Sequence, residues 1–408
     1  MFETLKTYLR YTSWPIIAAM VVLVIWGILA IRASEQADPA IGGYAAKQVR
    51  FAAVGVAAFV VSTLLPYQVL GRYAYLIFGV TLAMLATVLA LPPIRYSHRW
   101  IVLGGLQVQV SELAKLAYVV MLAWYLRYRK NYRRLAGLAA PFVLTFVPLA
   151  LILVEPDLGT SLLFLPTLYV MLFAAGAKLR HLLGIVAVAT VVVLLPVPRA
   201  IDSDSPTPAL AYAEVRFAGQ RYGLSAAALA LMEPHQRDRV FGWLHQEELK
   251  SSDKGRQLAQ SKRIIGVGRL SGYGDWNDGE MYFQMLPEDH TDFIFSVVAG
   301  RWGFLGCVGI LLLYGVIFLF GAEIAVITYD PFGRLLAVGV LALLFSQIVI
   351  NAGMTMGLMP VTGMTLPLMS YGGSSLVMNC AALGLLVNVG QRRPILLGPR
   401  PFEHKGDS

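Results

Sequence analysis

Charged residues are scarce in this chain. Asp, Glu, Lys and Arg make up 14% of its 408 residues, whereas about a quarter is usual for a soluble domain. Hydrophobic residues make up 57%. A chain this long and this apolar does not fold around a single soluble core. The shortage of charge therefore excludes an ordinary soluble enzyme and points to a membrane protein.

Cysteine and the common cofactor motifs are scarce as well. Only Cys307 and Cys380 are present, both inside apolar runs, so we expect small buried side chains and no disulfide. The sequence has no HExxH motif and no Cys/His cluster, which argues against a zinc site. It also lacks a Walker loop: the glycine-rich run GVGRLSG at 266–272 has the wrong spacing, and a tight turn is the better interpretation.

What the chain does contain is a series of apolar runs, each about 20 residues long, the length that crosses a bilayer as a helix. Backbone groups in lipid must be satisfied within the chain, so we expect helices there and no strands. The sequence predicts an all-α membrane protein, residues 1–408, with ten transmembrane helices in a single domain. The predicted spans are 14–32, 46–65, 73–92, 110–127, 139–154, 158–176, 180–197, 292–321, 332–358 and 371–390.

The positive charge predicts an orientation. The net charge of +9 at first suggests a nucleic-acid partner. The cations lie in short loops between apolar runs, however, so we expect no nucleic-acid partner. The basic loop 127–134, Lys178 with Arg180, and the tail from Arg392 fall on the N-terminal side when ten helices are counted. The positive-inside rule makes that side cytoplasmic. Both termini are then cytoplasmic, and the large loop 198–291, between the seventh and eighth helices, is external.

Two charged motifs lie in or beside predicted helices. Glu112 and Lys115, in QVSELAK, are three residues apart and can pair on one helix face. Such a pair in a membrane is either a functional site or a structural ion pair, and both interpretations stay open. In EPDLGT, residues 155–160, we expect Asp157 to cap the next helix, and a solvated turn is the alternative.

Two further stretches suggest binding surfaces. The motifs PHQRDRV (234–240) and QSKRIIGVG (260–268) are locally basic. They suit anionic lipid headgroups or a pyrophosphate, with a solvated face as the alternative. The run GLMPVTGMTLPLMSYGGSS (357–375) is apolar but broken by Gly and Pro. Irregular backbone at membrane depth needs protein or a cavity around it, so this run predicts a re-entrant wall beside a polar cavity.

The last motif, PEDHTDFIFS at 287–296, places ionisable side chains at the start of an apolar helix. Thr291 or Asp292 is the expected N-cap of that helix. Capping accounts for one of these side chains. It leaves the cluster of His290, Thr291 and Asp292, beside the long basic loop, without an explanation.

These motifs, in this order, resemble the SEDS family of bacterial cell-wall polymerases, which contains RodA, FtsW and SpoVE. The resemblance covers nearly the whole chain and is carried by RW…QVSELAK, EPDLGT, QSKRIIGVG, LPEDHTDFIF and PVTGMTLPLMSYGGSS. It implies a ten-helix peptidoglycan glycosyltransferase that joins lipid II units at the outer face of the bacterial cytoplasmic membrane, for cell-shape maintenance or division. It also implies a class B penicillin-binding protein, a transpeptidase, as partner, besides lipid II and membrane lipids.

The resemblance also assigns residues to roles. It equates Asp292 with the essential acid of the family. The residues that it implies for substrate binding are Arg99, Glu112, Lys115, Asp157, Arg239, Gln260, Ser261, Lys262, His290, Thr291 and Ser370. A divalent cation, Mg²⁺ or Mn²⁺, is the only cofactor considered, and no ligands are assigned to it. The chain departs from the family pattern at Val110 (usually Pro), Arg269 (usually Gly), and Gly300 and Arg301 (usually two Glu).

The implied reaction joins a sugar hydroxyl of one lipid II to the anomeric carbon of another and releases a lipid pyrophosphate. Inversion in one displacement needs a base and cations on the phosphates, but no covalent nucleophile. Asp292 is the predicted base, and Lys115, Arg99 and the loop cations are candidates for the pyrophosphate. Two alternatives stay open: a flippase or transporter for lipid-linked precursors, and a scaffold without catalysis, suggested by the missing acids at 300 and 301.

Overall fold

The computed structural model describes residues 11–37, 42–91, 99–103, 106–129, 131–155, 157–194, 214–217, 220–223, 243, 253–273, 286 and 289–392. Helices dominate these ranges, and a helix overlaps each of the ten predicted spans. Six stretches are long and apolar enough to cross a membrane. They are Trp14–Gln36 in α2 (Trp14–Ala37), α3 (Tyr44–Leu64), Leu135–Val154, α14 (Ile294–Ile327), α15 (Pro331–Thr355) and α16 (Gly373–Gln391).

Shorter helices and two small hairpins complete the described fold. The helices are α4 (Tyr67–Arg72), α5 (Ala74–Ala90), α6 (Val110–Leu126), η1 (Asn131–Arg133), η2 (Leu135–Leu138), α7 (Ala139–Val154), α8 (Leu158–Ala174), α9 (Leu179–Leu194) and α13 (Asp253–Val267). Strand β1 (Trp100–Leu103) pairs antiparallel with β2 (Leu106–Gln109), and β3 (Glu214–Phe217) pairs antiparallel with β4 (Gln220–Gly223). Both hairpins lie outside the predicted spans, as expected for strands in a membrane protein.

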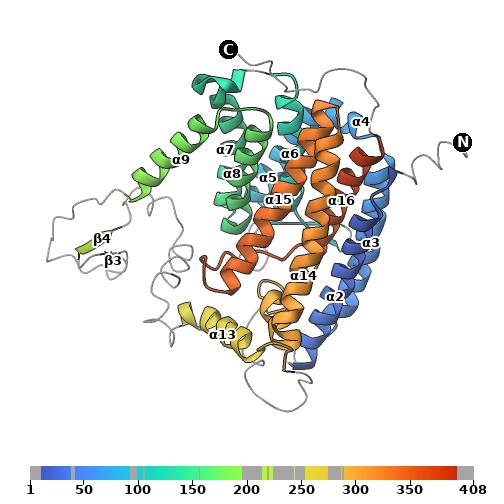
Figure 1. Cartoon of the computed structure of the whole chain (residues 1–408), viewed down its shortest axis with the longest axis vertical. Coiled ribbons are helices and arrows are strands. Elements are labelled where there is room, and N and C mark those ends of the chain that lie inside the picture. Colours follow the sequence, from blue (N-terminus) through green and yellow to red (C-terminus); the bar gives the residue numbers. More distant parts are fainter. Residues whose placement is uncertain are drawn as a thin grey trace, which may run out of the picture.

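Helix α15 is central to the bundle. It packs against α6, α8, α13, α14 and α16, and Figure 1 shows it among the long helices that run side by side. Its start follows from the sequence: Asp330 caps it by accepting from the N–H groups of Phe332 (3.3 Å) and Gly333 (3.2 Å), and Pro331 occupies the first turn. Its end follows from Gly357, whose φ of 81° stops the helix.

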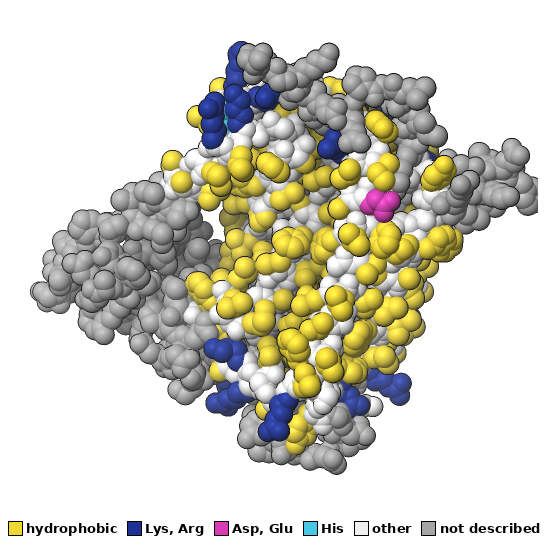
Figure 2. All heavy atoms as spheres, viewed as in Figure 1, with side chains coloured by type: hydrophobic (Ala, Val, Ile, Leu, Met, Phe, Trp, Pro, Cys, Tyr) yellow, Lys and Arg dark blue, Asp and Glu magenta, His cyan; other side chains and the backbone are white. Residues whose placement is uncertain are grey.

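The surface of the bundle matches a membrane environment. Figure 2 shows apolar side chains over the middle of the face in view, and Lys and Arg gathered toward its two ends. Several large apolar side chains are exposed on the outer helices, among them Leu64 (68%), Leu312 (66%) and Leu319 (68%). Apolar exposure on this scale is unusual for a soluble monomer and fits contact with lipid.

Helix α14 is bent near its start. A helix covers most of the predicted span 292–321, but Gly303 has φ 66° and ψ −162° and breaks the helical path. The N–H groups of Phe304 and Leu305 lose helical partners there and donate to the carbonyls of Arg269 (2.9 Å) and Leu270 (3.0 Å). The turn that follows α13 thus accepts the hydrogen bonds of the N–H groups that the kink leaves without helical partners.

The prediction that Thr291 or Asp292 is the N-cap of this helix is wrong. The helix begins at Ile294, its N-cap position is Phe293, and no side chain caps it. Thr291 and Asp292 instead lie in a turn before the helix. The helix starts late because the carbonyl of Asp292 accepts a hydrogen bond from the Asn351 side chain, and the first helical bonds run to Phe293.

Helix α13 and Trp243, both in the predicted external loop, are anchored to the bundle. Helix α13 lies across one end of the bundle beside the start of α14 (Figure 1). Its Ser261 hydroxyl is fully buried, lies 2.6 Å from the Ser296 hydroxyl and donates to the Thr355 carbonyl at 2.7 Å. The indole N–H of Trp243 donates to Gly357 O at 3.0 Å. The run 266–272 forms the tight turn expected for it.

The turn after α13 generates a stability prediction. Arg269 has φ 46°, a conformation that glycine adopts without strain and that costs other residues about 1 kcal/mol. We expect Arg269→Gly to raise the free energy of unfolding by about 1 kcal/mol. Thermal unfolding of the purified protein in detergent measures this change.

Gly272→Ala is the matched control in the same turn. Gly272 has φ +87°, and an added Cβ would lie 2.1 Å from Arg301 O, so this variant should be less stable than the parent. A lower melting temperature for Arg269→Gly would show that Arg269 is not strained.

Candidate functional site

The site is built around residues 356–372, which we call the irregular segment. It joins α15 to α16, has no regular secondary structure and is largely buried from 362 to 370, including Met364, Leu366, Leu368 and Met369. The expected break in helical structure is therefore confirmed. The re-entrant wall and the polar cavity that we expected beside it remain predictions.

Side chains from three helices satisfy the carbonyl groups of the irregular segment. Gln347 Nε2 of α15 donates to Thr365 O at 3.0 Å, and Gln48 Nε2 of α3 donates to Ser370 O at 3.0 Å. The hydroxyl of Tyr314, from α14, donates to Pro367 O. A buried carbonyl without a donor is costly, so these side chains determine where the segment runs.

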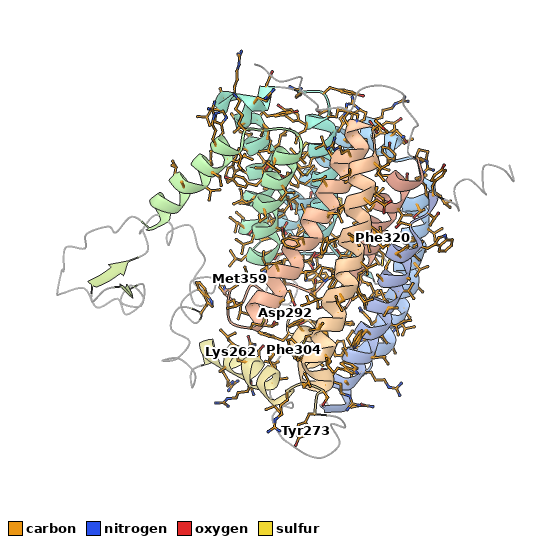
Figure 3. All side chains as sticks on the ribbon, viewed as in Figure 1. Lys262, Tyr273, Asp292, Phe304, Phe320 and Met359 are labelled. Atoms are coloured by element: carbon orange, nitrogen blue, oxygen red, sulfur yellow. The ribbon has the colours of Figure 1, made fainter. Side chains whose placement is uncertain are left out.

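One side of the irregular segment faces the turn formed by residues 289–293, which we call the Asp292 turn. Asn351 Nδ2 donates both to Asp292 O (3.0 Å) and to Met364 O (2.5 Å). The N–H of Tyr371 donates to His290 O at 2.9 Å. Asp292 itself is half-buried, and Figure 3 places it near Lys262 and Met359 at one end of the bundle, far from Phe320.

His290 is held in a stack of aromatic rings within the Asp292 turn. Its ring lies 4.5 Å from the Tyr44 ring and 5.7 Å from the Tyr371 ring, between centroids. Its Nδ1 lies 3.3 Å from the Asp289 carboxylate, and both side chains are buried. Lys47 Nζ lies 5.1 Å from the centroid of the Tyr44 ring, so a cation, two rings and a carboxylate follow one another.

A second polar group surrounds Asp157 at the start of α8. Its Oδ2 accepts from Gln109 Nε2 (3.0 Å), Ser111 Oγ (3.0 Å) and Thr160 Oγ1 (2.9 Å). Its Oδ1 accepts from the N–H of Thr160 at 3.2 Å, which confirms the predicted cap. Four donors on one buried carboxylate fix its orientation.

An ion pair and an arginine bound to a backbone carbonyl lie beside the residues of this group. Lys115 Nζ lies 2.9 Å from each carboxylate oxygen of Glu112, and both side chains are buried, so the predicted pair is confirmed. Arg99 Nε donates to the carbonyl of Glu155 at 3.0 Å. The carboxyl of Glu155 is fully buried, and neither of its oxygens has a hydrogen-bond partner among the described residues.

The Asp292 turn and the Asp157 group meet through the irregular segment. Asn351 joins the turn to Met364. On the other side, Gly159 packs so closely that an added Cβ would lie 2.6 Å from Met364 Cγ and 3.0 Å from Thr362 O. The N–H of Gln109 also donates to Ser374 Oγ at 3.0 Å. The fold thus brings together motifs that are far apart in the sequence.

The other predicted site residues are placed as follows. Ser261 and Ser370 are buried, and Ser370 Oγ accepts from the N–H of Leu366 at 2.7 Å. Gln260 is half-buried and Lys262 is exposed on α13. Arg239 lies outside the described residues. Within the described ranges, no three His, Cys, Asp or Glu side chains gather as metal ligands.

Sequence reasoning missed the amides that hold the site. Gln48, Gln347 and Asn351 are buried in membrane-length helices, yet none was singled out. The available signal was a polar side chain in an apolar run, because such residues in membranes usually face the interior and bind backbone carbonyls.

Comparisons with known proteins agree with this arrangement. The family model FTSW_RODA_SPOVE, described as "Cell cycle protein", matches residues 8–205 and 207–394. Peptidoglycan glycosyltransferase RodA of Treponema pallidum is 34% identical over 388 residues, which cover 85% of this chain and 89% of RodA. Peptidoglycan glycosyltransferase MrdB of Escherichia coli is 32% identical over 395 residues, 96% of each chain.

A solved structure shares the fold. Its description reads "Structural coordination of polymerization and crosslinking by a peptidoglycan synthase complex". The matched chain superposes with a TM-score of 0.74 at 30% identity, and the match covers 94% of this chain and 98% of that one. The likeness therefore extends over the whole bundle as well as over the motifs.

Glu155 generates a pH prediction. Burial, with a contribution from nearby Asp157, raises the pKa of the Glu155 carboxyl from 4.5 to about 8, although Arg99 opposes the shift. The folded protein then binds this proton more tightly than the unfolded chain does, so its contribution to stability falls as pH rises from 4.5 to about 8. Glu155→Gln should remove this fall and melt above the parent at pH 9, as measured by thermal unfolding from pH 5 to 9.

Glu323→Gln is the matched control, because Glu323 is exposed on α14 and its loss should leave the pH profile unchanged. Parallel profiles for the parent and Glu155→Gln would contradict the proposed protonation of Glu155.

Proposed function

This chain belongs to the FtsW/RodA/SpoVE family, and from that premise we propose that it is a peptidoglycan glycosyltransferase that joins lipid II units into glycan strands. One observation carries the proposal. The Asp292 turn is joined to the irregular segment by Asn351. Gly159 packs against the same segment, and the cations Arg99 and Lys115 lie beside the residues around Gly159. A base and cations that lie close to one segment suit a reaction in which the attacking hydroxyl and the leaving pyrophosphate flank one anomeric carbon.

In this mechanism Asp292 takes the proton from the acceptor hydroxyl as that oxygen attacks the anomeric carbon of the donor. The bond between that carbon and the pyrophosphate breaks in the same step, which inverts the configuration and requires no covalent intermediate. The half-buried carboxylate of Asp292 lies in a turn and not within a helix, so a substrate hydroxyl can approach it. The carbonyl of the same residue accepts the hydrogen bond from Asn351 Nδ2.

Cations stabilise the departing pyrophosphate in the proposal. Arg99 and Lys115 are the candidates on the Asp157 side, and Lys262 and Arg263 are exposed candidates on α13. A Mg²⁺ or Mn²⁺ ion is proposed only as a companion of the pyrophosphate. Such an ion needs one or two carboxylates besides the phosphates, and Asp157 already accepts four hydrogen bonds.

The proposed setting is the bacterial cytoplasmic membrane. The proposal has ten transmembrane helices, cytoplasmic termini, and an external loop that displays the Asp292 turn at the outer face, where lipid II is presented. A class B penicillin-binding protein is the proposed partner. The support is the description of the matched structure, which concerns polymerization and crosslinking in one complex.

Asp292→Asn tests the proposed base. The substitution preserves size and leaves the backbone bond from Asn351 in place, so the melting temperature should stay close to that of the parent. Polymerisation of lipid II should fall about 100-fold or more, the usual scale for a lost general base. The assay uses purified protein with its partner transpeptidase and separates glycan products on a gel.

Asp330→Asn is the matched control at the opposite end of the bundle, since Asn also caps a helix, and it should retain activity. Near-parental polymerisation by Asp292→Asn would rule out Asp292 as the base. Lipid movement across vesicles without any polymer from the parent would favour a flippase.

The orientation has its own test. In a background without Cys307 and Cys380, single cysteines at Lys130 and Lys262 should differ in labelling by a membrane-impermeant thiol reagent in intact cells. Lys262→Cys should label, because it is exposed on the proposed external helix α13. External labelling of Lys130→Cys would refute the orientation.

A further inference from the structure

We propose that Asn351 is a positioning residue for the polymerase reaction, whose side-chain amide fixes the Asp292 turn against the irregular segment. This inference rests on the proposed role of Asp292 as base. It concerns how that carboxylate is placed and adds no second proton acceptor.

The contacts of Asn351 are specific. It is fully buried near the end of α15, and its Nδ2 donates to Asp292 O at 3.0 Å and to Met364 O at 2.5 Å. Both neighbours are carbonyl oxygens, so only the nitrogen of the amide can face them. Each of its two amide hydrogens therefore binds a different segment, and the two segments are held at a fixed separation.

The same amide controls where the Asp292 side chain can lie. The turn is short, and helix α14 begins only at Ile294. A fixed carbonyl at Asp292 therefore fixes the Cα from which its carboxylate projects. A second hydrogen bond links this turn to the irregular segment and runs from the N–H of Tyr371 to His290 O, two residues upstream of Asp292. A displacement of about 1 Å at a catalytic group costs about 100-fold in rate.

The chain offers a closely matched control in Gln347. This residue lies one turn earlier on α15, is also buried, and its Nε2 donates to Thr365 O at 3.0 Å, in the same irregular segment. Neither Asn351 nor Gln347 has a partner for its side-chain oxygen among the described residues. The two amides differ in the segments that they bind: Gln347 donates to Thr365, whereas Asn351 also donates to the Asp292 turn.

The experiment compares Asn351→Ala with Gln347→Ala in the full-length protein with its partner transpeptidase. Both changes leave buried carbonyls without a donor, so both should lower the melting temperature. Per folded molecule, Asn351→Ala should lower kcat for lipid II polymerisation about 10- to 100-fold, with KM within about threefold. Gln347→Ala removes a bond to the same segment but none to the Asp292 turn, so it should lower kcat at least about threefold less than Asn351→Ala does. Asn351→Ser, whose hydroxyl can donate one bond, replaces the Ala variant if that one does not fold.

A double mutant separates positioning from general damage. If Asn351 acts through Asp292, its position no longer matters once the carboxylate is lost, so Asp292→Asn with Asn351→Ala should be about as active as Asp292→Asn alone. Multiplied losses in the double mutant, or equal losses for Asn351→Ala and Gln347→Ala, would overturn the inference. Full activity of Asp292→Asn would instead overturn the proposed role of Asp292 as the base, whatever Asn351 does, and absence of any polymer from the parent would overturn the proposed function.

Discussion

This site depends on one constraint, which is that backbone carbonyls inside an apolar helix bundle need hydrogen-bond donors from the protein itself. The irregular segment leaves the helical pattern inside a bundle of apolar helices, where each unpaired carbonyl costs free energy. Its carbonyls accept from amides or hydroxyls that project from α3, α14 and α15. The path of the segment follows from these donors, and the segment in turn separates the Asp292 turn from the group around Asp157.

The buried acids of the site differ in the partners that surround them. Asp157 accepts four hydrogen bonds, and Glu112 pairs with Lys115. Glu155 has neither arrangement, and burial raises its pKa to about 8. The three acids thus have three different kinds of surroundings.

Much of the architecture was predictable because bilayer thickness sets helix length and helical spacing sets local pairs. The helical segments, the Glu112–Lys115 pair and the Asp157 cap follow from such local rules. The kink at Gly303 and the late start of α14 do not, because they involve partners that are distant in sequence. The carbonyls of Arg269 and Leu270 accept hydrogen bonds at the kink, and the Asn351 amide donates one to Asp292 O. The amides of the site were overlooked for the same reason, since their partners are backbone atoms that a sequence pattern does not reveal.

The closed kink in α14 has a mechanical consequence. The turn after α13 supplies the missing hydrogen bonds of the kink, and Ser261 ties the same helix to α14 and α15. In the sequence, α13 belongs to a long loop, but in the folded protein it is hydrogen-bonded to the helix bundle. A force applied to α13 from outside the membrane would therefore be transmitted directly to the first turns of α14.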